Sequence, residues 1–146
     1  MRGLERTAAI LSFVAGGLHL MAGPQHLEEW WAYGLFFFGA AAAQAAYGLV
    51  LFTQGIEGWG GWLAVRGKVY LAGIVGNLAI FALWTVSRTV GVPIGPEAFE
   101  PEGLGVLDGA SKAVEAVLVA VLLRLVQLDR AASRPSPPFA RRPGEA

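Results

Sequence analysis

The stretch WAYGLFFFGAAAAQAAYGLVLF, residues 31–52, contains no charged side chain. A helix needs about 20 mostly apolar residues to cross the hydrocarbon core of a bilayer. Three further stretches have a similar character: residues 7–23, TAAILSFVAGGLHLMAG, residues 69–89, VYLAGIVGNLAIFALWTVSRT, and residues 110–128, ASKAVEAVLVAVLLRLVQL. Only α-helices and closed β-barrels satisfy all backbone polar groups in lipid. The sequence has no strand-like alternation long enough for a barrel, which leaves helices. We therefore predict an all-α fold, a four-helix transmembrane bundle with these stretches as its spans.

Composition supports lipid as the solvent of this chain. Of its 146 residues, 55% are hydrophobic and 15% are charged, whereas an average soluble domain has roughly 25% charged residues. The formal net charge is zero and there is no cysteine, which argues against nucleic-acid binding, disulfides and thiolate metal sites. We expect one transmembrane domain over residues 1–128 and a disordered cytoplasmic tail over residues 129–146, which is rich in Pro, Ser and Arg.

The basic residues predict the orientation of the spans. Arg2 and Arg6 precede the first span, and Arg66 and Lys68 lie between the second and third. The other two connections carry only acidic charges, and the tail is again basic. Because Lys and Arg stay on the cytoplasmic side, both termini are expected inside and both acidic connections outside. An alternative interpretation makes the first span a cleaved signal peptide, which would leave three spans with the same orientation.

Two amides are predicted to lie near the middle of the membrane. Gln44 is 13 residues from Trp31, and Asn77 is 11 residues from Arg88, so both fall at mid-membrane depth. An unpaired amide in hydrocarbon is costly, so we expect both side chains to face inward and to bond each other or a backbone carbonyl. They form either a clasp between helices or part of a polar path for an ion or ligand.

Polar residues also gather at the predicted outer end. This group contains both histidines and several charged residues: His19, His26, Glu28, Glu29, Arg88, Asp108, Lys112 and Glu115. The spacing of Asp108, Lys112 and Glu115 places them on one helical face. We expect Pro24 to begin a new helix, whose dipole would then favour carboxylates at Glu28 and Glu29.

Three interpretations of this outer group remain open. His19, His26 and Glu115 could bind a divalent metal such as zinc or copper. Alternatively, the two histidines ligate haem or help to form a quinone-like pocket beside Trp30, Trp31, Trp84 and Phe36 to Phe38. In the third interpretation the residues close the bundle as an ionic lock, with Arg88 bound to Glu115 or Asp108 and His19 bound to Glu115. The connection before the fourth span, stiffened by Pro93, Pro96 and Pro101, would cap this group or dock a partner.

Two runs of sequence carry a family resemblance: HLMAGPQHLEEWWAYGLFFF, residues 19–38, and GNLAIFALWTVSRTVGVPIGP, residues 76–96. The chain resembles a group of small bacterial four-helix membrane proteins that have no assigned function. The resemblance implies a multi-pass protein of the bacterial cytoplasmic (inner) membrane and brings no activity or cofactor with it.

The chain contains no HExxH motif and no phosphate-binding glycine loop followed by lysine. We therefore expect a non-enzymatic protein, acting as an accessory subunit, with a polar site at its outer face that could bind a metal. Its partners would be the lipid bilayer and another membrane protein or further copies of itself, with no nucleic acid. A haem- or quinone-binding electron-transfer protein, or a small ion or proton pathway or carrier, is the alternative.

Overall fold

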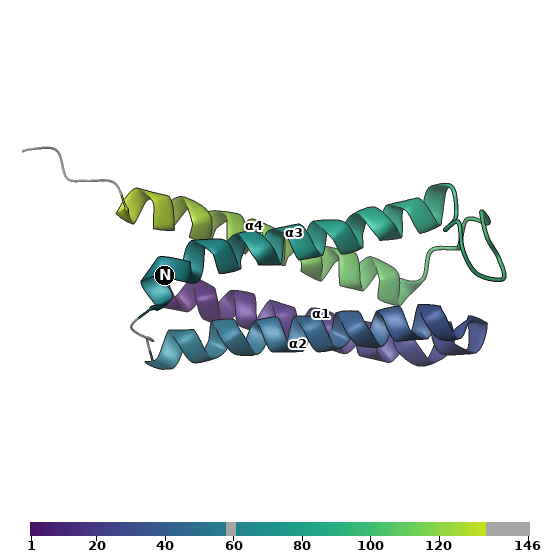
Figure 1. The fold of residues 1–146 in the computed structure, drawn as a ribbon, viewed down its shortest axis with the longest axis horizontal. Helices are drawn as coiled ribbons and strands as arrows, with labels where there is room; N and C mark the ends of the chain where they lie inside the picture. The colour runs from purple at the N-terminus through teal and green to yellow at the C-terminus, as the bar shows by residue number, and fades with distance from the viewer. Residues whose placement is uncertain (58–60, 134–146) are drawn as a thin grey trace, which may run out of the picture.

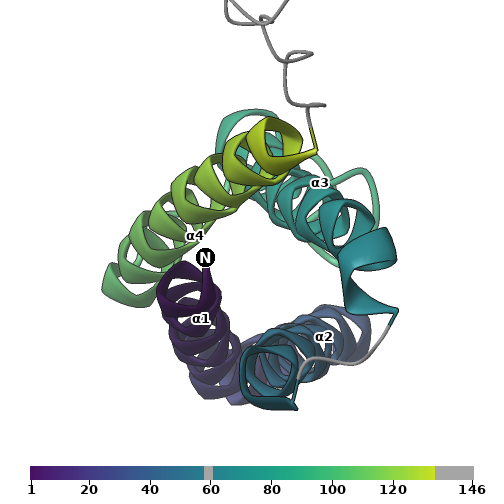
Figure 2. The same cartoon turned by 90° about the vertical axis from the view of Figure 1, so that its left-hand side faces the viewer.

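Four long helices make up the computed structural model, which describes residues 1–57 and 61–133. They are α1 (Arg2–Glu29), α2 (Trp31–Glu57), α3 (Trp62–Thr89) and α4 (Val106–Ala132). The helices lie side by side along the long axis of the molecule (Figure 1). Viewed from one end, α1 lies between α2 and α4, and α4 lies between α1 and α3 (Figure 2). The predicted all-helical class is therefore confirmed.

Three of these helices are long and apolar enough to cross a membrane, which indicates a membrane protein. They are α1, the Trp31–Thr53 part of α2, and α3. Each predicted span falls inside one helix. Helix α4 is not among the three, because charged residues such as Lys112, Glu115 and Arg124 interrupt its apolar sequence.

The distribution of side chains also fits a lipid environment. Large apolar residues point outward, for example Ile10, Leu20, Val75 and Leu78, which are 53–65% exposed. The interior contains a cluster of large apolar residues that includes Leu51, Tyr70 and Leu118, together with many alanines and the polar side chains of Ser12, Gln44, Asn77 and Glu115. Because lipid tails do not drive apolar helices together, the small residues and the hydrogen bonds also contribute to joining the helices.

Small residues bring α1 and α2 close together. A Cβ atom added at Gly16 would lie 3.1 Å from the Ala41 carbonyl oxygen, and one added at Gly48 would lie 3.1 Å from the Ala9 carbonyl oxygen. Helix α1 also packs on α4, and α4 on α3. The described residues show no comparably close packing between the backbones of α2 and α3. The close backbone packing of α2 is therefore with α1.

Two predicted boundaries are wrong. Pro24 does not begin a new helix but lies inside α1, which continues to Glu29 and ends at Trp30 in an extended conformation. Neighbouring helices allow membrane helices to tolerate an internal proline. Glu28 and Glu29 are consequently at a helix C-terminus, where the dipole does not favour carboxylates.

The predicted start of the tail is the second wrong boundary. Helix α4 extends to Ala132, so residues 129–132 are helical. Arg66 on α3 accounts for part of this extension, because its Nε lies 2.6 Å from the Asp129 carboxylate. The remainder of the predicted tail, residues 134–146, lies outside the described residues.

Candidate functional site

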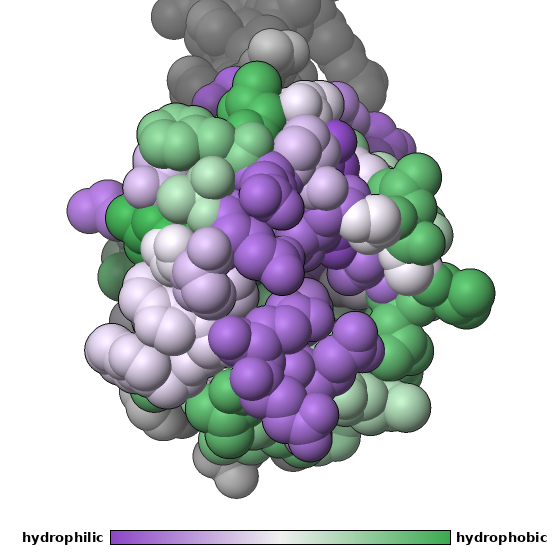
Figure 3. All heavy atoms as spheres, turned by 90° about the vertical axis from the view of Figure 1, so that its right-hand side faces the viewer, coloured by the Kyte–Doolittle hydropathy of each residue, from purple (hydrophilic) through white to green (hydrophobic). Residues whose placement is uncertain are grey.

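The polar residues of interest lie at one end of the molecule, which we call the loop end. It contains the α1–α2 junction, the α3–α4 connection (residues 90–105) and the start of α4. Hydrophilic residues gather over the middle of this end, with hydrophobic residues around them (Figure 3). The connection is fastened at two points: the Tyr33 hydroxyl donates to the Ile94 carbonyl oxygen at 2.8 Å, and the Glu102 N–H donates to the Ser87 carbonyl oxygen at 3.0 Å. Gly91 and Gly95, with φ of 74° and 98°, allow the tight turns between these points.

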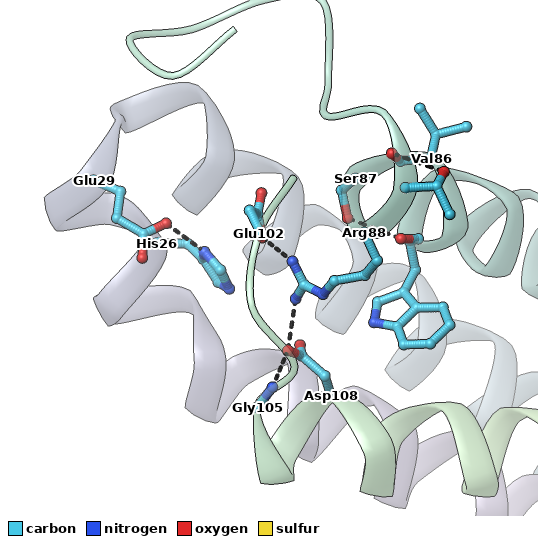
Figure 4. Close-up of polar contacts among 10 residues, drawn as sticks. His26, Glu29, Val86, Ser87, Arg88, Glu102, Gly105 and Asp108 are labelled. Carbon is cyan, nitrogen blue, oxygen red and sulfur yellow. Dashed lines mark hydrogen bonds and ion pairs between the residues drawn. The ribbon is translucent and has the colours of Figure 1, made fainter. Parts of the chain in front are cut away.

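Arg88 is held between two carboxylates at the loop end (Figure 4). Its Nη2 donates to Asp108 Oδ2 at 2.6 Å, and its Nη1 donates to Glu102. The Asp108 carboxylate also accepts the Gly105 N–H at 3.1 Å, which caps the start of α4. The expected contact of Arg88 with Asp108 is confirmed. Glu102 was not anticipated, because its partner depends on the path of the α3–α4 connection, for which the sequence has no periodic signal.

A second polar network surrounds Glu115, which is 1% exposed. His19 Nε2 lies 2.8 Å from Glu115 Oε1, and Lys112 Nζ lies 2.5 Å from Glu115 Oε2. The Ser111 hydroxyl donates to Glu115 Oε1 at 3.1 Å. The expected contact between His19 and Glu115 is confirmed, and it joins α1 to α4.

His26 belongs to a different set of contacts. Its Nδ1 lies 2.8 Å from Glu29 Oε2, and its ring stacks on Phe37 with centroids 4.1 Å apart and planes inclined by 11°. Glu28 is exposed. The predicted ligands His19, His26 and Glu115 are not brought together, and no group of three His, Asp or Glu side chains in residues 1–57 and 61–133 could hold a metal ion.

Between these networks lies a cavity of about 140 Å³. Its wall is largely apolar and aromatic, with contributions from all four helices and from the α3–α4 connection; the aromatic members are Tyr33, Phe36, Phe37 and Trp84. Arg88, Glu102 and Asp108 lie at the boundary with a second, more open hollow of about 580 Å³, which the acidic α3–α4 connection lines. The Arg88 cluster therefore separates the aromatic cavity from a polar hollow.

Within residues 1–57 and 61–133, two buried side-chain N–H groups at this cavity have no hydrogen-bond partner. They are Trp84 Nε1 and Arg88 Nε, and both residues line the cavity. They are four residues apart on α3, so their side chains lie on the same helical face. A buried donor without a partner costs about 1–3 kcal/mol. The pair could therefore bind an acceptor oxygen placed in the cavity.

The predicted pair of amides lies deeper in the molecule. Gln44 Nε2 donates to Asn77 Oδ1 at 3.0 Å, which confirms the expected bond between α2 and α3. Asn77 Nδ2 donates to the Gly73 carbonyl oxygen at 2.8 Å. Ser12 on α1 adds a third helix, because its hydroxyl lies 2.7 Å from both the Gln44 carbonyl oxygen and Oε1. These contacts form a clasp that joins three helices.

One buried carboxylate was missed by sequence reasoning. Glu5 is 3% exposed, accepts a hydrogen bond from the Tyr70 hydroxyl at 2.5 Å and lies 3.4 Å from Trp62 Nε1. The sequence places Glu5 before the first predicted span, where a charged residue is ordinary. Its burial depends on two aromatic residues that are distant in the chain.

The geometry at the loop end is suited to binding. It combines a ring-sized apolar cavity with two N–H donors, and the cations of the cavity wall are already paired with carboxylates.

Comparison with known proteins found no matching family, curated protein or solved structure.

Proposed function

We propose that this chain is a multi-pass protein of the bacterial cytoplasmic membrane that binds a small ligand in the cavity at its loop end. All four helices cross the bilayer as a bundle, including α4, and both termini are cytoplasmic. The loop end then faces the outside. The alternating placement of basic residues supports this orientation. The burial of Lys112 and Glu115, with Glu115 bound to His19 of α1, supports the inclusion of α4.

The observation that carries the binding proposal is the pair of buried donors, Trp84 Nε1 and Arg88 Nε, at the edge of an apolar cavity. Buried polar groups in folded proteins nearly always have a partner. Ligand sites are typically apolar hollows with a few convergent polar groups that orient the ligand. The proposed ligand is therefore an apolar molecule with at least one acceptor oxygen, and the protein acts as a binding protein or accessory subunit.

The two ionic networks give the cavity a fixed shape. Arg88 is anchored to α4 through Asp108 and to the α3–α4 connection through Glu102. Glu115 anchors His19 of α1. Because the Arg88 donor is held in place before a ligand arrives, little of its side-chain entropy would be lost when the ligand binds.

The indole N–H of Trp84 offers a direct test. Protein labelled with ¹⁵N at its tryptophans is placed in nanodiscs, and the Trp84 signal is assigned by its loss in Trp84→Phe. Acetophenone, an aromatic ketone, should shift this signal downfield as the carbonyl accepts a hydrogen bond. Ethylbenzene, which has a similar shape and no acceptor, should produce a much smaller shift.

Trp31 provides the matched control, because it is 64% exposed and does not line the cavity. Its signal, assigned in the same way with Trp31→Phe, should respond equally to the two compounds. The binding proposal is wrong if acetophenone leaves the Trp84 signal unmoved, or if the ketone and the hydrocarbon shift it equally.

A further inference from the structure

We propose that the ligand is a neutral, membrane-dissolved lipid with a ring carbonyl, the chemical class to which isoprenoid quinones belong. Its ring occupies the cavity, and its hydrocarbon tail passes between α2 and α3 into the bilayer. This inference rests on the proposed function and adds the ligand class and its route to the site.

The size of the cavity selects a single ring. A volume of about 140 Å³ is close to that of an engineered apolar cavity of about 150 Å³ that holds benzene. Phe36 and Phe37 on α2 and Trp84 on α3 provide aromatic surfaces for such a ring. A longer molecule must leave part of itself outside the cavity.

The charges of the wall select a neutral ring. Arg88 is paired with Glu102 and Asp108, and Lys112 is paired with Glu115. His19 and His26 each contact a carboxylate as well. An anion would find these cations already paired and would approach several carboxylates. A carbonyl oxygen has two lone pairs and can accept both Trp84 Nε1 and Arg88 Nε without bringing a charge.

The side of the cavity between α2 and α3 offers an opening to lipid. Phe36 on α2 and Leu83 on α3 line the cavity, yet each is 39% exposed. Among the described residues, the hydrogen bonds between these two helices occur at Gln44–Asn77 and at Tyr47–Val69. Both bonds lie at or below the clasp, and none is found on the loop-end side of it.

The opening also lies at a depth that a membrane lipid reaches. Phe36 is eight residues from Gln44, and Leu83 is six residues from Asn77. At about 1.5 Å per residue this places the opening roughly 9–12 Å from the clasp. With the clasp near the bilayer centre, the opening is within the hydrocarbon core, whose half-thickness is about 15 Å.

The test uses two probes with the same ring and tail length. 4′-Decylacetophenone is neutral and 4-decylbenzoate is an anion, and in both the acceptor oxygen lies on the side of the ring opposite the tail. Both are titrated into nanodiscs, and binding is followed through the Trp84 indole signal. We expect the ketone to bind about tenfold more tightly than the carboxylate, a difference of about 1.4 kcal/mol.

The route is tested with a matched pair of variants on α3. Leu83→Trp fills the opening, whereas Val86→Trp places the same side chain at a position that is also 39% exposed but does not line the cavity. We expect about tenfold weaker binding of the ketone to Leu83→Trp, as overpacking of this size predicts, and unchanged binding to Val86→Trp. A ketone with a diazirine at the end of its tail should crosslink to the loop-end halves of α2 and α3 in the unaltered protein.

The outcomes separate this inference from the proposed function. Tighter or equal binding of the carboxylate overturns the neutral class but preserves the cavity as a binding site. Ketone binding with crosslinks only on α1 and α4 overturns the route, and this readout holds even if Leu83→Trp fails to fold. If neither probe moves the Trp84 signal, both proposals are wrong.

Discussion

Gly73 on α3 lies against the side chains of Tyr47 on α2 and Leu122 on α4. A Cβ atom at this position would collide with the Tyr47 hydroxyl and would lie 2.9 Å from Leu122 Cδ1. Tyr47 cannot move without losing its 3.1 Å hydrogen bond to the Val69 carbonyl oxygen. We therefore predict that Gly73→Ala lowers the free energy of unfolding in detergent by about 1–3 kcal/mol.

Gly76 is the control for this substitution. It lies on the same helix, and a Cβ atom there would meet nothing within 4 Å. Because alanine favours a helix by about 1 kcal/mol over glycine, Gly76→Ala should leave stability unchanged or raise it. Equal stability changes at Gly73 and Gly76 would show that the close approach is absent.

Glu115 is the residue on which the buried ionic network depends. Substitution of one partner in a buried ion pair typically costs about 3–5 kcal/mol, because the other charge remains buried without compensation. We predict a loss of this size for Glu115→Gln, measured by denaturant unfolding, since Lys112 would lose its carboxylate. The double variant Lys112→Met/Glu115→Gln should recover most of the loss.

The control for Glu115 is Glu28→Gln, which changes an exposed carboxylate at the same end of the molecule. It should unfold like the unaltered protein. Full stability of Glu115→Gln would contradict the network as described.

Single residues differ in how far sequence alone could place them. His19 and Glu115 were predictable as a pair, because ionisable groups inside apolar stretches must face the interior and find partners. Glu5 was not, since its burial comes from Tyr70 and Trp62, which are 65 and 57 residues away in the chain. Trp84 was expected beside a pocket, but its unpartnered indole N–H was not. Glu102 depends on the folded path of a proline-rich connection. The donors that define the cavity are therefore visible only in three dimensions.

At the scale of helices, the clasp between α2 and α3 should give a measurable coupling free energy between Gln44 and Asn77. Gln44 and Asn77 share one hydrogen bond of 3.0 Å in the protein interior. Hydrogen bonds between membrane helices average about 0.6 kcal/mol and reach about 1.7 kcal/mol. A double-mutant cycle of Gln44→Leu and Asn77→Leu should give a coupling in this range.

A second cycle tests the specificity of this coupling. Thr85 on α3 is exposed, and its hydroxyl donates to the Phe81 carbonyl oxygen of its own helix. Gln44→Leu and Thr85→Val should therefore be additive. A coupling between Gln44 and Asn77 no larger than this control would exclude a role for the clasp in holding α2 to α3.

The presence of each helix was predictable from the sequence, whereas the residues at which the helices begin and end were not. All four apolar stretches lie within helices, because each is long enough to require a hydrogen-bonded backbone in lipid. Pro24 was misleading, since proline is common at helix starts and α1 nevertheless continues through it. The faces of the helices were ambiguous for a similar reason. Gly73 and Asn77 are buried, whereas the adjacent Ala72 and Gly76 are exposed. Because small residues occur on both faces of α3, the sequence pattern could not show which face is buried.

At the scale of the whole molecule, the proposed crossing of the bilayer by α4 rests on where its charged side chains lie. Its sequence carries more charge than those of the other helices, but Lys112 and Glu115 are turned inward against α1. Its outward residues include Val117, 52% exposed, and Leu123, 48% exposed. Arg124 is exposed but lies near the end of the predicted span, where a long side chain can reach the membrane surface, so α4 can face lipid along its outer side.

The last prediction is therefore one of topology, and the absence of cysteine from the chain makes it direct to measure. Single cysteines replace Arg2, Gly61, Glu97 or Arg130, all exposed positions at the two ends of the molecule. A membrane-impermeant maleimide applied to spheroplasts should label Glu97→Cys at once and the other three only after permeabilisation, because Lys and Arg remain in the cytoplasm. Labelling of Arg130→Cys together with Glu97→Cys would mean that α4 does not cross. In that case α4 would lie on the outer surface, and the buried pair of His19 and Glu115 could not form as described.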